Sequence, residues 1–238
     1  MTGIRVADLT YTYGAKTALD GVSFEVGMGT FCALLGPNGA GKSTLFNLLT
    51  RLFVAPKGRI AIAGHDLDTA PRAALSKLGI VFQQSTLDLD LTVRQNLSYF
   101  ASLHGLAGRD RARRIENQLE RLDIMDRSRE KARTLNGGHR RRTEIARALL
   151  HDPAVLLLDE PTVGLDAAAR AGITDHVHGL AADGTTVLWA THLADEVCPD
   201  DQLVVLHQAR VLADGLARDV SRGQPLQKAF LAMTAEPA

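Results

Sequence analysis

The stretch GPNGAGKST, residues 36–44, has the residue types and spacing of a phosphate-binding loop. Its glycines allow the backbone to curl so that successive N–H groups point at anionic oxygens, and a following helix would add the positive end of its dipole. Lys42 would then reach the β- and γ-phosphates of a nucleotide, and the hydroxyl of Ser43 would bind Mg²⁺. An ordinary glycine-rich turn is the alternative. The apolar run before the stretch and the amphipathic pattern after it favour the phosphate site.

An acidic pair ends the apolar run AVLLLDE, residues 154–160. Such a run is typical of a buried strand, which would carry Asp159 to the carboxyl edge of a parallel sheet, where open α/β sheets bind ligands. Asp159 could hold Mg²⁺, and the adjacent Glu160 could accept a proton from a water in line with the γ-phosphate. The alternative is a surface acidic pair at the end of a strand, which the nearby phosphate-loop pattern disfavours.

Two further polar residues also end apolar runs: Gln83 follows GIVF, and His192 follows TTVLWAT. Alone, a histidine in this position is usually a capping or turn residue, and the glutamine is weaker still. Because parallel strands end at one edge of a sheet, we expect both residues to lie beside Lys42 and Asp159. This convergence, rather than either residue alone, makes them candidates.

A pair of adjacent glycines lies in TLNGGHRRRTE, residues 134–144, before the helical pattern IARALL. Glycine loses more backbone entropy on folding than any other residue, so the pair requires an explanation. A bare structural turn is one interpretation, and a close approach of the backbone to a ligand is the other.

Apolar runs separated by helical spacing indicate a mainly parallel α/β sheet. A mostly helical block, from Thr92 to about Leu150, interrupts that sheet, and a late antiparallel hairpin is predicted at 202–215. PKG, residues 56–58, is predicted as a turn. Four leucines at helical spacing predict a helix after the phosphate loop: Leu45, Leu48, Leu49 and Leu52. The predicted strands are residues 4–9, 22–26, 31–35, 59–64, 79–83, 154–160 and 185–192.

The composition is that of an ordinary globular protein. The 238 residues allow one large domain or one domain with an inserted subdomain, and the net charge of zero gives no support to polyanion binding. Residues 109–147 nevertheless carry 13 Lys and Arg against 7 Asp and Glu. This excess indicates a solvated helical face or a surface that contacts a partner or lipid headgroups.

Two features bear on the cellular compartment. Cys32 and Cys198 are far apart and have no metal-like spacing, which indicates a reducing compartment rather than a disulfide scaffold. The opening MTGIRVADLT has no apolar core of a signal peptide, and no stretch is long and apolar enough to span a bilayer. A cytosolic protein is therefore expected.

Taken in order, GPNGAGKST, Gln83, LNGGH, LLLDEPTVGLD and ATH resemble the ATP-binding subunit of ABC transporters, from Tyr13 to about Gly215. The resemblance implies a P-loop NTPase fold of the α/β class. It further implies a RecA-like core, an antiparallel β subdomain and a helical subdomain inserted at about residues 85–150. The whole chain, residues 1–238, would be a single ABC ATP-binding domain.

The resemblance also implies a head-to-tail dimer that holds ATP and Mg²⁺ between one subunit's P-loop and the other's LNGGH. There the two glycines would let backbone N–H groups approach the γ-phosphate. Implied catalytic residues are Glu160, His192, Gln83 and Lys42, and implied Mg²⁺ ligands are Ser43, Gln83 and Asp159. Implied ATP-binding residues are Tyr13, Ala18, Gly36, Pro37, Asn38, Gly39, Ala40, Gly41, Lys42, Ser43, Thr44, Leu135, Asn136, Gly137, Gly138, His139 and Asp166.

Individual roles follow from the same resemblance. Tyr13 would stack on adenine, whereas Tyr11 is the more ordinary strand aromatic. Asp166 would reach across the dimer, and His192 would contact the γ-phosphate. LNGGH departs from the usual Leu-Ser-Gly-Gly-Gln, with Asn136 for serine and His139 for glutamine. An amide can still donate a hydrogen bond to a phosphate oxygen, so activity is expected to be retained.

The implied function is ATP hydrolysis that drives transport through separate membrane permease subunits, with the chain peripheral at the cytoplasmic face of the inner membrane. Residues 83–106 resemble the drug-resistance and polysaccharide exporter group, which favours export. The run STLDLDLTVRQNL, residues 85–97, and LNGGHRRR also resemble cassettes associated with quinoprotein alcohol dehydrogenase systems. Arg94 is expected to be exposed where the permease docks.

Two alternatives remain open. A soluble ABC-type ATPase that acts on nucleic acid or ribosomes typically duplicates the cassette or inserts long coiled coils, and this chain shows one cassette with about 90 residues between its P-loop and LNGGH. An unrelated P-loop kinase or GTPase leaves LNGGH and His192 unexplained. The partners expected are therefore a second copy of the chain and the permease, with no nucleic acid.

Overall fold

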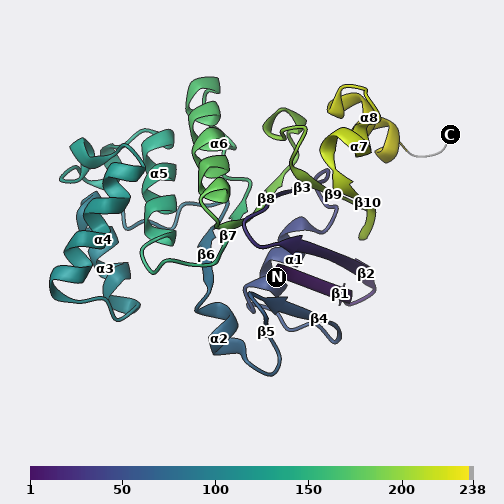
Figure 1. Cartoon of the computed structure of the whole chain (residues 1–238), viewed down its shortest axis with the longest axis horizontal. Helices are drawn as coiled ribbons and strands as arrows, with labels where there is room; N and C mark the ends of the chain where they lie inside the picture. The colour runs from purple at the N-terminus through teal and green to yellow at the C-terminus, as the bar shows by residue number, and fades with distance from the viewer. Residues whose placement is uncertain (236–238) are drawn as a thin grey trace.

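The computed structural model describes residues 1–235 and contains two β-sheets. The first is antiparallel, in the order β2-β1-β4-β5 (Figure 1). Its strands are β1 (Thr2–Tyr13), β2 (Lys16–Gly27), β4 (Lys57–Ile62) and β5 (His65–Asp66). Residues 236–238, part of the single domain predicted for the whole chain, lie outside the described residues.

The second sheet has six strands in the order β10-β9-β3-β8-β7-β6, and its neighbours pair in parallel except for β10 with β9. Every residue of β3, β7 and β8 is buried, as expected of strands covered on both faces. These apolar runs were predicted as strands, and the predictions are confirmed, as is the hairpin of β9 and β10. The bounds are β3 (Phe31–Leu35), β6 (Leu78–Val81), β7 (Val155–Asp159), β8 (Thr186–Thr191), β9 (Gln202–His207) and β10 (Arg210–Leu216).

Two apolar cores lie on opposite faces of the six-stranded sheet. Along β3, Phe31, Ala33 and Leu35 enter the core under the helices, whereas Cys32 and Leu34 enter the core shared with the antiparallel sheet. Helix α1 (Lys42–Leu49) is packed into the second core through residues such as Phe46. The P-loop segment is thereby anchored at both ends.

The helical block between β6 and β7 contains α3 (Val93–Leu103), α4 (Gly108–Arg121) and α5 (Gly137–Ala148), with 3₁₀ turns at 125–127 and 132–134. These helices form the left-hand end of the molecule in Figure 1. The prediction of a helical block without a strand is confirmed within the described residues.

The remaining helices are α2 (Pro71–Leu75), α6 (Ala167–Ala182), α7 (Ala217–Ser221) and α8 (Leu226–Thr234). Helix α6 runs beside α5 and leads from β7 to β8 (Figure 1). None of the helices within residues 1–235 is long and apolar enough to cross a membrane.

Two local predictions were wrong. Of the turn predicted at 56–58, Lys57 and Gly58 are instead the start of β4. Gly58 has φ +102°, and a Cβ there would lie 2.5 Å from the Cα of Leu9. The glycine is needed because β4 crosses β1 closely at a bulge. Leu52 is exposed beyond the end of α1, because that helix ends at Leu49.

Candidate functional site

The P-loop leaves β3 and enters α1 through a tight turn. Gly36 donates its N–H to the carbonyl of Thr191 at 3.3 Å, and a Cβ at Gly36 would lie 2.4 Å from the carbonyl of Leu206. Gly41 caps α1 with φ +114°, and a Cβ there would lie 2.5 Å from the carbonyl of Ala18. Both glycines are therefore required by close backbone contacts as well as by the curled loop.

Lys42 is buried at the start of α1, with 5% of its surface exposed. Its Nζ donates to the carbonyls of Gly36 at 2.7 Å and Pro37 at 3.3 Å, and lies 3.4 Å from Oε1 of Glu160. A cavity of about 380 Å³ opens beside it. The cavity is lined by Tyr13, Lys16, Thr17, Ala18, Asn38, Gly39, Gly41, Lys42, Ser43, Thr44, Gln83 and Glu160.

Glu160 lies at the point where the predicted strand ends converge. Gln83 donates from Nε2 to its Oε2 at 3.1 Å, and Nδ1 of His192 lies 3.3 Å from its Oε1. Glu160 has a left-handed φ of +44°, which is unfavourable for a residue with a side chain. Its N–H donates to the carbonyl of Ala190 at 2.9 Å. The structure thus brings Lys42, Gln83 and His192 around the carboxylate of Glu160, a residue whose backbone is strained.

Asp159 is buried directly before Glu160. Burial is the main cause that raises its pKa, to about 6, and the neighbouring Glu160 raises it further, while Lys42 and Arg141 act in the opposite direction. A buried carboxylate beside a second carboxylate favours a nearby cation, and the oxygen donors of Asp159, Ser43 and Gln83 are of the kind that Mg²⁺ prefers.

Tyr13 lies at the rim of the cavity, with 47% of its surface exposed. Its hydroxyl is 3.4 Å from that of Thr44, and its ring meets Tyr11 and Phe53 edge-on at centroid distances of 5.1 Å and 6.0 Å. Tyr11 instead stacks on Phe53 and is partly buried. The ring with an accessible surface is therefore Tyr13, in line with the distinction drawn from the sequence.

The glycine pair forms the first turn of α5 and does not precede that helix. Asn136 caps the helix, because its Oδ1 accepts the N–H of His139 at 2.9 Å. A Cβ at Gly137 would lie 2.8 Å from a methyl of Leu165, and one at Gly138 would lie 3.1 Å from the Cβ of Ala169. The glycines therefore let α5 pack closely against the start of α6.

The two halves of the predicted ATP site are separate within one chain. No residue of the described stretch 135–139 lines the cavity beside Lys42. Asp166 caps α6 by accepting the N–H of Ala169 at 2.8 Å, and so belongs with the α5 side. The chain by itself assembles Lys42, Gln83, Glu160 and His192 but not LNGGH.

Three charged residues of α5 were missed as site residues. Arg141 donates to the carbonyl of Gln83 at 2.9 Å, Glu144 accepts the N–H of Thr86 at 3.0 Å, and Arg147 donates to the carbonyl of Thr86 at 2.9 Å. Their spacing of three residues places them on one helix face, which is the one signal that the sequence offered. They hold the segment that follows β6 by its backbone.

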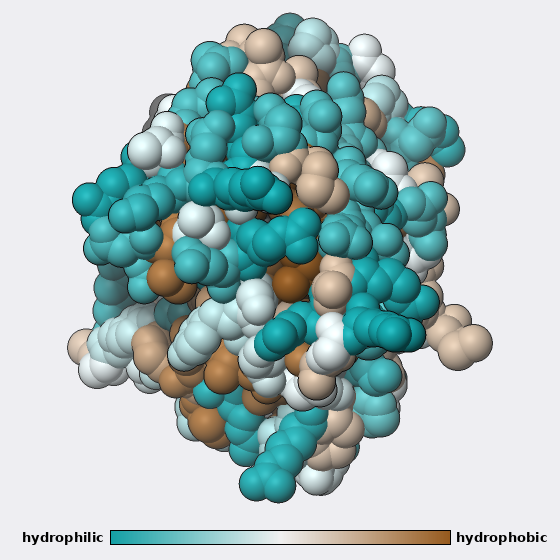
Figure 2. Space-filling model, turned by 90° about the vertical axis from the view of Figure 1, so that its left-hand side faces the viewer, coloured by the Kyte–Doolittle hydropathy of each residue, from teal (hydrophilic) through white to brown (hydrophobic). Residues whose placement is uncertain are grey.

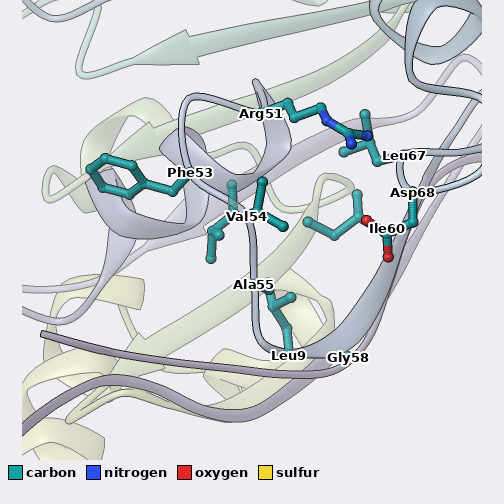
Figure 3. A pocket seen from close by; sticks show the side chains of 10 residues that line it. Leu9, Arg51, Phe53, Val54, Ala55, Gly58, Ile60, Leu67 and Asp68 are labelled. Atoms are coloured by element: carbon teal, nitrogen blue, oxygen red, sulfur yellow. The ribbon is translucent and has the colours of Figure 1, made fainter.

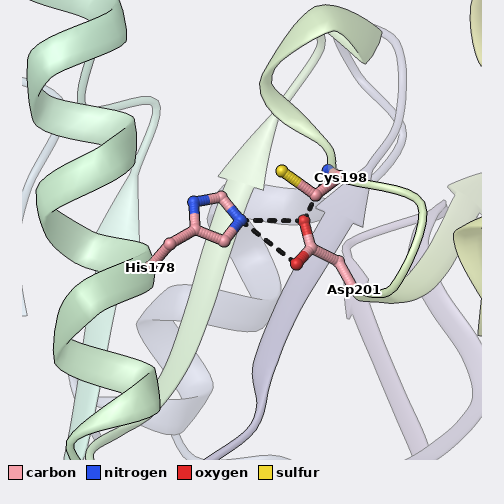
Figure 4. A group of neighbouring side chains, drawn as sticks. All are labelled: His178, Cys198 and Asp201. Carbon is pink, nitrogen blue, oxygen red and sulfur yellow. Dashed lines mark hydrogen bonds and ion pairs between the residues drawn. The ribbon is translucent and has the colours of Figure 1, made fainter.

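A further group of polar residues, His178, Cys198 and Asp201, joins α6 to the start of β9 (Figure 4). Nδ1 of His178 donates to the carbonyl of Thr174 at 2.9 Å, and its Nε2 lies 2.9 Å from Oδ2 of Asp201. Burial lowers the pKa of His178, but these hydrogen bonds outweigh it and raise the pKa overall. Cys198 contributes its backbone N–H to the same carboxylate. A protonated imidazole paired with Asp201 accounts for this geometry without a metal ion.

A small cavity also lies between α1 and the antiparallel sheet (Figure 3). Its volume of about 20 Å³ is near that of a single water, which excludes a nucleotide-sized ligand. The surrounding side chains include Leu9, Phe53, Val54, Ile60 and Leu67.

Comparison with known proteins identifies close similarity to one group. The sequence profile described as "ABC transporter" matches residues 19–163. A daunorubicin resistance ATP-binding protein of Streptomyces coeruleorubidus is 41% identical over 92% of this chain and 70% of its own length. The Nod factor export ATP-binding protein I of Rhizobium meliloti is 38% identical over 89% of this chain and 64% of its own. A solved structure described as the ATP-binding subunit of an ABC transporter superposes with a TM-score of 0.85 at 29% identity, covering 98% of this chain and 99% of that one.

Proposed function

The chain belongs to the ABC transporter family of ATP-binding proteins, and from this premise we propose that it hydrolyses ATP to drive an exporter. The observation that carries the proposal is the surroundings of Glu160, whose carboxylate oxygens lie 3.1–3.4 Å from the side chains of Lys42, Gln83 and His192. Lys42 begins α1, whereas Gln83, Glu160 and His192 follow the ends of β6, β7 and β8. A base, a cation and two polar groups gathered at one sheet edge suit attack of water on a phosphoryl group.

The role of each residue follows from its position. The P-loop backbone and Lys42 would bind the β- and γ-phosphates, and Tyr13 would stack on adenine. Ser43, Gln83 and Asp159 would hold Mg²⁺, which when bound neutralises charge on the phosphates. Glu160 would accept a proton from the attacking water, and His192, beside that carboxylate, would contact the γ-phosphate.

We propose further that two copies assemble head to tail. The LNGGH turn and Asp166 lie outside the P-loop cavity of their own chain, so a second copy is needed to bring that turn to the phosphates. The free N–H groups in the first turn of α5, which carries Gly137 and Gly138, would then face the γ-phosphate. Each ATP would be held by both chains.

The helical end of the molecule supports a membrane permease as the other partner. Figure 2 shows this end as a mostly hydrophilic face broken by apolar patches. Leu89, Tyr99 and Leu103, on and just before α3, are exposed apolar side chains. Arg94 was expected to be exposed but is half-buried, with its guanidinium 3.6 Å from Glu116. We therefore propose that these apolar residues carry the permease contact, through which the chain would be peripheral at the cytoplasmic face of the membrane.

The export direction rests on the relatives. One is named for daunorubicin resistance and another for Nod factor export, and the chain spans 70% and 64% of their lengths. The likeness to cassettes of quinoprotein alcohol dehydrogenase systems stays a prediction. The positive excess at 109–147 gives little support to nucleic acid, because Arg114, Arg121, Arg133 and others form ion pairs with acidic residues.

Phosphate release from ATP·Mg²⁺ tests the proposed function. The wild-type chain should turn over ATP, and Lys42→Ala should abolish turnover, because the phosphates lose their buried cation. Arg5→Ala, which removes an exposed ion pair on the antiparallel sheet, should leave turnover intact. ATP that binds the wild-type chain but is never hydrolysed would contradict the proposal.

A further inference from the structure

Glu196 is a buried acidic residue outside the cluster around Glu160. It ends the 3₁₀ turn Ala194–Glu196, and 3% of its surface is exposed. Within residues 1–235 it takes part in no ion pair of the structure. A buried carboxylate without a cation is costly unless hydrogen-bond donors satisfy it, so its partners should explain why it is there.

Three side chains donate to this carboxylate. Oε2 accepts the indole N–H of Trp189 at 3.0 Å and the hydroxyl of Thr191 at 2.6 Å. Oε1 accepts the hydroxyl of Thr162. The oxygen of Thr191 also accepts the backbone N–H of Leu193 at 3.0 Å, which fixes the turn after β8.

These donors lie beside the two residues that flank the reacting centre. Thr162 is two residues after Glu160, and Thr191 immediately precedes His192. The carbonyl of Thr191 in turn accepts the N–H of Gly36 at the start of the P-loop. One carboxylate therefore ties the turn after β7 to the turn after β8 beneath the P-loop.

The backbone of Glu160 shows why such a tie is needed. Its left-handed φ of +44° is strained, and strained residues persist only where the surrounding structure fixes them. The N–H of Glu160 is held by Ala190, but the turn that follows it is held to Glu196 through the hydroxyl of Thr162. Glu196 is bonded in turn to two side chains of β8. If that turn relaxed, the carboxylate of Glu160 would move away from Lys42 and His192.

We propose that Glu196 is a positioning residue that holds Glu160 and His192 in their reactive arrangement. This inference rests on the proposed ATPase function and deepens it. Glu196 does not touch the reacting atoms, so its loss should lower kcat while leaving the residues that bind ATP in place. A misplacement of reacting groups of about 1 Å can cost about 10²-fold in rate.

The test compares four variants of the full chain. Thr162→Val removes one hydroxyl at constant shape, and Glu196→Leu removes the whole acceptor. Glu196→Gln is the conservative variant: its amide oxygen can accept from Trp189 and Thr191, and its NH₂ group can donate to the hydroxyl of Thr162. Thr186→Val is the matched control, because it removes a buried hydroxyl from the opposite end of β8.

The measurements are kcat, KM for ATP, the unfolding midpoint and tryptophan emission. Trp189 is the one tryptophan of the chain, so its emission reports directly whether the network is broken. We expect Thr162→Val and Glu196→Leu to lose about 10–100-fold in kcat with KM within about twofold of wild type. Glu196→Gln should recover most of the loss relative to Glu196→Leu, and Thr186→Val should stay near wild type.

Several results would overturn the inference. Wild-type kcat in Thr162→Val would do so, even if Glu196→Leu failed to fold, and so would an equal loss in Thr186→Val. A fall in ATP affinity that matched the fall in kcat would make Glu196 part of the binding site instead. If the wild-type chain binds ATP but shows no turnover, the proposed function is rejected and this inference with it.

Discussion

Arg141 and Glu144 form a buried ion pair on α5, with Nη1 of the arginine 2.8 Å from Oε2 of the glutamate and less than 10% of either side chain exposed. Both residues also hold the backbone after β6, since Arg141 donates to the carbonyl of Phe82 at 2.7 Å and Glu144 accepts the N–H of Thr86 at 3.0 Å. The helix that begins with LNGGH is thereby fastened to the segment that carries Gln83. A shift of either one must move the other.

The first prediction is that removing Glu144 destabilises the chain strongly. Glu144→Ala leaves Arg141 buried without its partner and the N–H of Thr86 without its acceptor. Breaking a buried pair in this way costs about 3–5 kcal/mol of unfolding free energy, measured by urea denaturation. Glu25→Ala, which breaks an ion pair exposed on both sides, is the control and should change little. Equal effects of the two variants would show that the α5 pair does not fasten these two segments.

The second prediction concerns the pH dependence of stability through His178. Its pKa is raised in the folded chain, despite burial, by its hydrogen bonds to Asp201 and Thr174. A raised histidine pKa contributes stability that is present below the unfolded value, about 6.5, and is lost as the pH rises through the folded pKa. As the pH rises from about 6.5 through the folded pKa, the unfolding free energy of wild type should therefore fall relative to that of His178→Gln.

The comparison with His178→Gln is needed because other histidines change the unfolding free energy in the opposite direction as the pH rises. Burial lowers the pKa of His104, His151 and His176, so their contribution grows as the pH rises. These histidines are common to both proteins and cancel in the difference of unfolding free energies. A difference that stays flat across the window would mean that His178 is not paired as a cation with Asp201.

The sequence predicted the sheet better than it predicted the contacts beneath the site. β3, β7 and β8 are buried on both faces, so their apolar runs are unambiguous. The residues that follow β7 and β8, Glu160 and His192, are thereby placed at the same edge as the P-loop that follows β3. The contacts of Arg141 and Glu196 could not be found in this way. Apart from Glu144, which lies three residues after Arg141 on the same helix, their partners are backbone carbonyls, hydroxyls and an indole N–H in other elements. No local periodicity records those contacts.

The third prediction concerns Glu160 itself. Glu160→Gln keeps the size of the side chain but cannot accept the proton of the attacking water, so ATP should bind without being hydrolysed. The head-to-tail dimer should then persist, and size-exclusion chromatography with light scattering in ATP·Mg²⁺ should show twice the monomer mass. Lys42→Ala in the same background is the control and should remain monomeric. A protein that binds ATP but stays monomeric at every concentration would contradict the head-to-tail dimer.

The last prediction separates the two roles of Asn136, as helix cap and as donor to phosphate. Asn136→Ser and Asn136→Asp both keep an oxygen that can accept the N–H of His139, so neither should lower the unfolding free energy appreciably. Activity should differ, because the serine hydroxyl can donate to a phosphate oxygen whereas the aspartate brings a like charge against it. Losing one such donor typically costs about 10²–10³ in rate.

The defect of Asn136→Asp should also act on the partner's site. In a heterodimer of Asn136→Asp with Lys42→Ala, one composite site carries both lesions and the other carries neither. Either variant alone can form only composite sites that carry a lesion, so mixing two nearly inactive proteins should restore ATP hydrolysis. Should crosslinking confirm the heterodimer while phosphate release stays at background, either LNGGH acts within its own chain or both sites must be intact for turnover.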